Sequence, residues 1–196
     1  MNEMTKNTLI MTAFALTFGL LLGLVHAVTA GPIAAQHERQ KNEAYSAVLE
    51  AASDFSENME IDQAVHDAIE QDSNYNASIT SVINAKDDSG STVGYVIDVS
   101  SHGGYGGDIN FSIGIGSDGS VEGISITKIA ETPGLGMKAQ SDPAFCEQFI
   151  GGDSSELKLS SEGGEINGIT SATFTSRCMV RGVNAGLKYY QDVING

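Results

Sequence analysis

Two segments near the middle of the chain, Val93–Val99 (VGYVIDV) and Ile109–Ile115 (INFSIGI), decide its fold. Both are rich in β-branched residues and alternate between two faces, as half-buried strands do. Two further segments of the same kind, Ser78–Ile83 (SITSVI) and Val121–Ile126 (VEGISI), stand before and after them. Turn sequences rich in Asp, Ser and Gly connect the first pair and the last pair, which predicts an antiparallel sheet of two hairpins.

Helical patterns flank these strands on both sides in the sequence. One face of the predicted sheet is apolar and the other is mixed, which favours helices packed on one side. Apolar residues recur at helical spacing in four segments. These segments are about Asn42–Phe55, Ile61–Gln71, Asp142–Ile150 and Phe174–Val193. The predicted fold class is therefore α+β, an antiparallel sheet with helices packed on it.

An apolar segment near the amino terminus predicts a single transmembrane helix before this domain. Residues 8–30 carry no charge and are long enough to span about 30 Å of hydrocarbon. A cleaved secretory signal is the alternative, with a passable cleavage site at residues 28–30, but such signals have a shorter apolar core. Lys6 precedes the segment and Arg39 and Lys41 follow it, so the positive charges leave the orientation open.

The chain is thus expected to have four parts. They are a short tail (residues 1–7), the transmembrane helix (8–30), a linker (31–41) and one domain (42–196) of a size that holds a real core. The 25 acidic and 10 basic residues give a formal net charge of −15. This charge argues against nucleic acid or anionic lipid headgroups as binding partners.

The two cysteines, Cys146 and Cys178, do not form a paired CxxC motif. This spacing excludes a common zinc or iron–sulfur framework within the chain. It leaves either one disulfide or two buried thiols, and we favour thiols because both residues lie on helical apolar patterns. His66 has no partner at a recognised metal-binding interval, so no metal site is expected. No GxGxxG dinucleotide fingerprint follows a strand.

The segment Ile166–Ser176 (INGITSATFTS) is a hydroxyl-rich turn that opens the last predicted helix. Free backbone N–H groups and the helix dipole favour a phosphate at such a position. An ordinary Ser/Thr cap is the alternative for this stretch taken alone. Two glycine-rich turns, Glu131–Gly136 (ETPGLG) and Gly103–Gly107 (GGYGG), favour a bound cofactor, because their backbone can approach a flat ring closely.

On these three motifs and the single anchor, the chain resembles the FMN-binding domain family. That family includes the G subunit of the Rnf electron-transport complex and the C subunit of the sodium-translocating NADH:quinone reductase. Its members carry FMN through a phosphoester on the last threonine of a Ser/Thr-Gly-Ala-Thr element, attached by a separate flavin transferase. The element here reads Thr170–Thr173 (TSAT), so the resemblance implies Thr173 as the acceptor. Ser171 replaces the usual glycine, and Asn167 stands where an acidic residue is common.

The resemblance also implies a set of residues that contact the cofactor, and no catalytic residue among them. Thr132 is expected to donate a hydrogen bond to the flavin, Leu135 to cover a ring face, and Tyr105 to stack or hydrogen-bond. The full set is Thr173 as the covalent site, with Thr170, Ser171, Ala172, Thr175, Glu131, Thr132, Gly134, Leu135, Gly136, Gly104, Tyr105 and Gly106.

The function implied by the resemblance is electron transfer through covalent FMN in a membrane-bound, ion-translocating ferredoxin:NAD oxidoreductase of the Rnf type. The expected partners are the other membrane and redox subunits, a flavin transferase for maturation, and the lipid bilayer. The family pattern places the domain on the extracytoplasmic side of the cell membrane. Nothing in the chain binds NAD or iron–sulfur centres, so it is not expected to catalyse the complex's reaction alone.

Two alternatives stay open at this point. The first is a free-standing, membrane-anchored extracytoplasmic flavoprotein that carries electrons outside any complex. The second is a non-redox interaction module in which the hydroxyl-rich turn is only a helix cap.

Overall fold

The computed structural model describes residues 2–153 and 156–196. Met1, the first residue of the predicted tail, lies outside the described residues, as do residues 154 and 155. The described chain forms two compact units, Met1–Lys41 and Asn42–Gly196.

Helix α1 runs from Glu3 to Val48. Its residues up to Lys41 belong to the first unit, and residues 42–48 belong to the second. Within α1, residues Glu3–Thr29 are long and apolar enough to cross a membrane, and no side chain in their most apolar stretch is buried. Residues 31–41, expected as a linker, continue the helix, and Pro32 lies inside it. Proline removes one backbone donor from a helix but need not end it.

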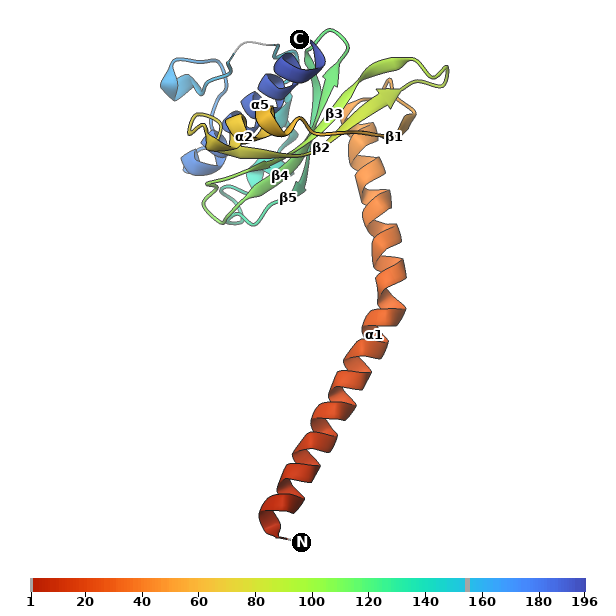
Figure 1. Cartoon of the computed structure of the whole chain (residues 1–196). Coiled ribbons are helices and arrows are strands. Elements are labelled where there is room, and N and C mark those ends of the chain that lie inside the picture. Colours follow the sequence, from red (N-terminus) through yellow and green to blue (C-terminus); the bar gives the residue numbers. More distant parts are fainter. Residues whose placement is uncertain (1, 154–155) are drawn as a thin grey trace. The chain divides into compact units, whose positions relative to one another are not determined.

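The second unit is built on a five-stranded antiparallel sheet in the order β1-β2-β3-β4-β5 (Figure 1). The four predicted strands are confirmed as members of this sheet. Strand β1 was not predicted: the helix expected up to Phe55 ends at Val48, and a short polar strand follows it. The strands are β1 (Asp54–Met59), β2 (Ala77–Lys86), β3 (Thr92–Ser101), β4 (Ile109–Gly116) and β5 (Val121–Lys128).

One face of the sheet is covered by α2 (Gln63–Gln71) and α5 (Thr173–Tyr189), which lie side by side across the strands (Figure 1). The core between them and the sheet contains Phe111 and Met179, both almost fully buried. A hydrogen bond of 2.8 Å from the Asp62 N–H to the Tyr189 hydroxyl ties the start of α2 to α5. The predicted α+β class is therefore confirmed.

The remaining helical segments are short. They are α3 (Lys138–Ser141), α4 (Pro143–Glu147), a 3-10 turn (Ser160–Glu162) and a π-helical turn (Tyr190–Ile194) that continues α5.

The opposite face of the sheet is covered by the last turns of α1, where Tyr45 and Val48 pack with apolar residues of β2 and β3. Gly114 of β4 and Gly123 of β5 are paired across the strands, and a Cβ on either would meet the Val48 backbone. These glycines let the helix approach the sheet closely. The expectation of helices on one side only was therefore wrong, because the glycine pair makes room for a helix on the second face.

Candidate cofactor-binding site

Three segments far apart in the sequence meet around the side chain of Glu131, which is 7% exposed. The Gly106 N–H donates a hydrogen bond of 3.3 Å to its Oε1. A Cβ built on Gly136 would lie 2.6 Å from Glu131 Oε2 and also 2.6 Å from Thr175 Oγ1. The two glycine-rich turns and the first turn of α5 therefore lie against one another, and only glycine fits at position 136.

Helix α5 begins without a side-chain cap. Its N-cap residue is Ala172, and the first helical hydrogen bond, 3.0 Å long, joins the Ser176 N–H to the Ala172 carbonyl. Among the described residues, the N–H groups of Thr173, Phe174 and Thr175 have no acceptor. The Ser176 N–H is engaged in the helix, so the donors available to a phosphate are the three groups before it. An ordinary Ser/Thr cap is not what opens this helix.

Ser176 instead closes the turn that leads into the helix. Its Oγ accepts a hydrogen bond of 2.8 Å from the Ile169 N–H and donates one of 2.9 Å to the Ala172 carbonyl. Inside this turn Ser171 has a φ of +63°, a left-handed conformation that L residues other than glycine adopt at a cost. The position is the one at which the family element has glycine.

The side chain of Thr175 points to a missing partner. Thr175 is 1% exposed, and its Oγ1 has no hydrogen-bond partner in the described structure. A buried hydroxyl without a partner costs free energy, and such groups commonly belong to a ligand site. This hydroxyl lies at the same helix start as the three free N–H groups.

Several predicted contact residues lie exposed at the surface beside this polar centre. Thr170, Ser171, Thr173, Thr132 and Gly134 are all exposed. Exposed apolar side chains lie in the same three segments: Tyr105 is 75% exposed, Leu135 40% and Phe174 61%. Phe174 was missed by the sequence reasoning, and its place directly after Thr173 is the signal that would have identified it.

The structure thus separates the predicted residues into two groups. Glu131, Gly136 and Thr175 are buried and form a scaffold with Gly104, which is partly buried, and Gly106, which is exposed but donates to Glu131. A Cβ on Gly104 would lie 2.7 Å from Glu131 Oε1. The exposed residues named above are carried on this scaffold. Ala172 is buried and caps α5.

A small groove of about 230 Å³ lies beside Thr170. Lys138, at the start of α3, lines it and is the one cation among its lining residues. Gln148 fixes the facing segment, because its Oε1 accepts from the Asn167 N–H at 2.8 Å and its Nε2 donates to the Asn167 carbonyl at 3.2 Å. Lys138 therefore lies near the predicted attachment element.

His102 adjoins the Gly103–Gly107 turn and has partners that the sequence did not reveal. Its Nδ1 lies 3.2 Å from Asp108 Oδ1, and its Nε2 lies 2.9 Å from the Ser78 hydroxyl. Ser78 in turn donates to Glu70 Oε1 at 3.1 Å. A chain of four polar side chains therefore runs from this turn to α2.

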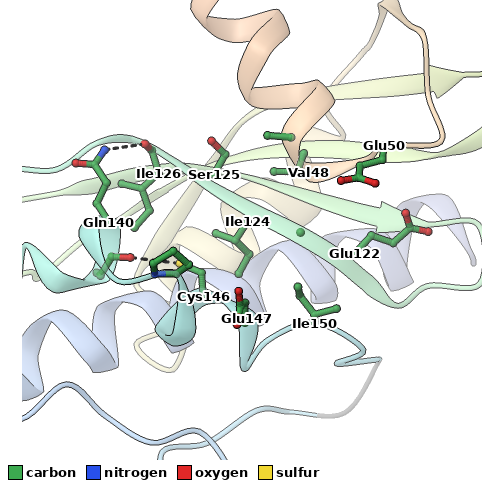
Figure 2. A pocket seen from close by; sticks show the side chains of 14 residues that line it. Val48, Glu50, Glu122, Ile124, Ser125, Ile126, Gln140, Cys146, Glu147 and Ile150 are labelled. Atoms are coloured by element: carbon green, nitrogen blue, oxygen red, sulfur yellow. Dashed lines mark hydrogen bonds between the residues drawn. The ribbon is translucent and has the colours of Figure 1, made fainter.

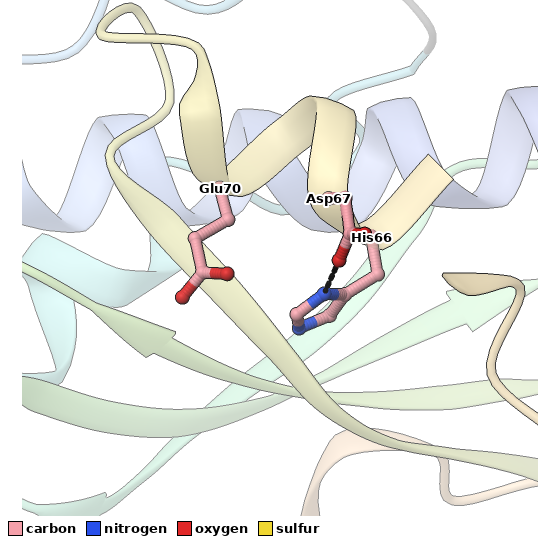
Figure 3. A group of neighbouring side chains, drawn as sticks. All are labelled: His66, Asp67 and Glu70. Atoms are coloured by element: carbon pink, nitrogen blue, oxygen red, sulfur yellow. Dashed lines mark hydrogen bonds and ion pairs between the residues drawn. The ribbon is translucent and has the colours of Figure 1, made fainter. Parts of the chain in front are cut away.

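His66, Asp67 and Glu70 form a second polar cluster on α2, with ligand-type atoms within 4.8 Å of one another (Figure 3). Glu70 follows His66 by one helical turn, an interval that the sequence reasoning overlooked. Hydrogen bonds, first from Gln63 and then from His66, lower the pKa of Asp67. Both carboxylates already accept hydrogen bonds from side chains outside the cluster, Gln63 to Asp67 and Ser78 to Glu70.

Both cysteines are free thiols, as favoured from the sequence. Cys178 is 1% exposed on α5, and burial raises its pKa. Cys146 is half-buried, and burial raises its pKa to about 11.

Comparisons with known proteins match the chain to named families. Residues 104–188 match the FMN-binding domain, and residues 1–48 match the RnfG N-terminal region. The chain is 31% identical over 194 residues to the G subunit of the Na⁺-translocating ferredoxin:NAD⁺ oxidoreductase complex of Acetobacterium woodii, covering 96% of this chain and 92% of the relative. It is 28% identical over 188 residues to the G subunit of the ion-translocating oxidoreductase complex of Methanosarcina acetivorans, covering 95% and 94%.

Among solved structures, the chain is similar to the C subunit of the Na⁺-translocating NADH-quinone reductase from Parabacteroides distasonis. The TM-score is 0.49 at 23% sequence identity, over 59% of this chain and 63% of that chain.

Proposed function

The chain belongs to the family formed by the G subunits of Rnf-type, ion-translocating oxidoreductase complexes, and on that premise we propose that it relays electrons through FMN attached to Thr173. Its partners are the other subunits of such a complex, and its apolar helix α1 makes it a membrane protein. FMN accepts and passes on one or two electrons when bound, which is the chemistry that an electron relay requires.

The observation that carries the proposal is the start of α5. Three N–H groups without acceptors, the positive end of a helix dipole and the unpartnered Thr175 hydroxyl lie within the first turn. A phosphate satisfies such donors and is stabilised by the dipole. Thr173 is the first residue of this helix, so a phosphoester on its side chain would lie beside those groups.

The attachment itself is supported by the exposure of the acceptor. Thr173 is exposed, and within the described residues its hydroxyl makes no hydrogen bond, so a transferase can reach it. The residues before it, Thr170 and Ser171, are exposed as well. No residue directly before or after Thr173 in the sequence is a base that would activate it for a reaction of its own, which favours modification by a separate flavin transferase.

The ring of the flavin is expected against the exposed apolar side chains of Tyr105, Leu135 and Phe174. Large exposed apolar groups next to polar donors are typical of a ligand site. Glu131 plays a different part from the one its motif suggested, since its carboxylate faces the Gly106 N–H and the Gly136 backbone. It positions the two glycine-rich turns against α5.

The two alternatives make different predictions. A free-standing carrier would have the same site but would not purify with membrane subunits. A non-redox module would carry no flavin at all, and its main support, a Ser/Thr cap on α5, is absent because Ala172 holds that position without a side-chain bond.

The orientation of the anchor rests on the family resemblance, which places the domain outside the cytoplasm. Asp88 is exposed in the β2–β3 turn, so a cysteine there tests the orientation. A membrane-impermeant maleimide added to intact cells should label Asp88→Cys and leave the wild type, whose thiols are shielded, nearly unlabelled. Labelling that appears only after the cells are lysed would place the domain in the cytoplasm.

The attachment is tested by fluorescence of the denatured protein. Wild-type chain expressed with an active flavin transferase should retain flavin fluorescence in a denaturing gel, and Thr173→Ala should lose it completely. Thr92→Ala is the matched control, since it removes an exposed threonine hydroxyl outside the attachment element and should keep the band. A band that survives in Thr173→Ala, or a wild type without a band, would refute the assignment.

A further inference from the structure

A second and larger groove, of about 530 Å³, lies along the outer side of β5 (Figure 2). Its apolar wall contains Ile124 and Ile126 of β5, Val48 at the end of α1, and Ile150 after α4. Ile150 is 52% exposed, although it is a large apolar side chain. Such an exposed apolar surface is typical of a site that another molecule covers.

The strand that forms the floor of this groove is the edge of the sheet. At the start of β5 the edge is already paired, because the backbone of Val121 forms hydrogen bonds of 2.8 Å with Gly151 and Gly152. Near the end of β5 the Ile126 carbonyl is already paired, because it accepts a hydrogen bond of 3.0 Å from Gln140 Nε2. The stretch between these paired positions, residues 122–125, faces the groove. Open sheet edges readily accept an added segment of chain.

The rim of the groove is acidic. Glu50, Glu122 and Glu147 line it and are exposed, and no Lys, Arg or His belongs to the lining within the described residues. An occupant must therefore combine apolar side chains with positive charge. A second copy of this chain fits poorly, since each copy has a formal net charge of −15.

The groove is also connected to the candidate cofactor site through the chain. The turn that carries Leu135 and Gly136 runs directly into α3, and Ala139 and Gln140 of α3 line the groove. Five residues of fully extended chain span at most about 18 Å, so Leu135 and Gln140 are closer than that. A partner seated in the groove therefore lies near the site at which electrons enter or leave.

We propose that this groove, defined by β5 and the three glutamates, docks an apolar, Lys/Arg-bearing segment of another membrane protein of the same complex. The inference rests on the proposed function, since it takes the complex as given and assigns the surface that joins it.

The first test reverses the charge of the rim. The variant Glu122→Lys/Glu147→Lys is compared with Asp88→Lys/Glu60→Lys, which makes the same change in charge at exposed positions outside the groove. Each tagged full-length chain is purified from membranes of its host in mild detergent. We expect the groove variant to lose co-purifying membrane subunits about tenfold or more and the control to keep them.

Retained flavin fluorescence in the groove variant shows that its domain is folded and modified. Equal recovery of subunits with both variants, or equal loss with both, would overturn the assignment, because neither result depends on the groove. A wild-type chain that brings down no other membrane protein would instead contradict the proposed function, and this is seen before any variant is made.

The second test measures protection of the groove directly. Ile150→Cys should react rapidly with a maleimide in the isolated chain and at least several-fold more slowly in the assembled complex. Asp88→Cys should react at the same rate in both states. Equal reaction rates for Ile150→Cys in the two states would overturn the proposal. Protection in the isolated chain that grows with its concentration would also overturn it, because a second copy of the chain would then be the occupant of the groove. If a small molecule that co-purifies with the isolated chain protects Ile150→Cys, the proposal is likewise overturned, because that molecule and not a protein segment occupies the groove.

Discussion

The two long helices of this protein differ in a way that composition alone does not explain. Helix α1 carries leucines that are exposed in the structure, with Leu20 at 74% and Leu22 at 70%. Helix α5 buries residues along most of its length, including Met179 at 0% and Leu187 at 3%. The amino-terminal part of α1 is apolar all round, whereas α5 has one apolar stripe that meets the sheet. A helix that is apolar on all sides is stable in the hydrocarbon interior of a lipid bilayer and not in water.

The largest expected effect comes from truncating the buried helix. Leu187→Ala removes packed methyl groups from the core under the sheet and should lower the free energy of unfolding by about 2–5 kcal/mol. Chemical unfolding of the full-length chain in detergent, followed by circular dichroism of the domain, measures the change.

The same substitution in α1 is the matched control. Leu22→Ala should change the stability of the domain by about 0.5 kcal/mol or less, since no core residue of the second unit is lost. A comparable loss of unfolding free energy in Leu187→Ala and Leu22→Ala would contradict the distinction between a helix packed in the domain core and one outside it.

A charge in the apolar helix gives the next largest effect. Leu22→Lys should make membrane insertion less favourable by about 2.5–3.5 kcal/mol if position 22 lies near the bilayer centre. The fraction of the chain that resists alkaline extraction of membranes should therefore fall. Arg181→Lys, at an exposed position of α5, is the comparison and should leave extraction unchanged. An unchanged membrane fraction for Leu22→Lys would contradict the assignment of α1 as an anchor.

The sequence predicted the sheet well because its signal is local. Alternation and turn residues placed β2 to β5 within a few residues of their observed bounds. Strand β1 (DFSENM) has no such alternation and owes its conformation to pairing with β2, which a local pattern does not reveal. The second helical cover was missed for a similar reason, because it depends on Gly114 and Gly123 lying together across two strands.

The sequence predicted which segments form the candidate site but not how their side chains are arranged. The motifs identified the three segments, and the structure brings them together. The inward position of the Glu131 carboxylate and the orphaned Thr175 hydroxyl depend on contacts between residues 25 or more positions apart, so no spacing in the sequence indicates them. In the Asp108–His102–Ser78 chain only Ser78 is distant, 24 positions before His102, whereas Asp108 follows His102 within the same turn and could have been considered from the sequence.

A smaller effect is expected at the turn before α5. Ser171→Gly relieves a left-handed backbone conformation and should stabilise the domain by about 1–2 kcal/mol. Ser141→Gly, at the end of α3, relieves no such strain and should have no stabilising effect. Thermal unfolding of the two variants distinguishes them, and equal shifts would show that strain at position 171 is not the cause.

The smallest effect concerns the thiols. Cys178 on α5 should not react with iodoacetamide until the domain unfolds, whereas Cys146 should react slowly at neutral pH. Because burial raises the pKa of Cys146 from 9.0 to about 11, its alkylation rate should still be rising above pH 9. The stability contributed by its neutral form is complete below pH 9 and is lost as the pH rises through 11. A rate that levels off near pH 9 would show that this thiol is not shielded.

The central claim is that the start of the buried helix, α5, holds FMN on Thr173. Trypsin cleavage after Lys158 and Arg177 releases residues 159–177, which contain this threonine. In chain matured with an active flavin transferase, mass spectrometry of this peptide should show the mass of FMN less one water, located on Thr173 by fragmentation. The same peptide found unmodified in matured protein, or modified at another residue, would contradict the account.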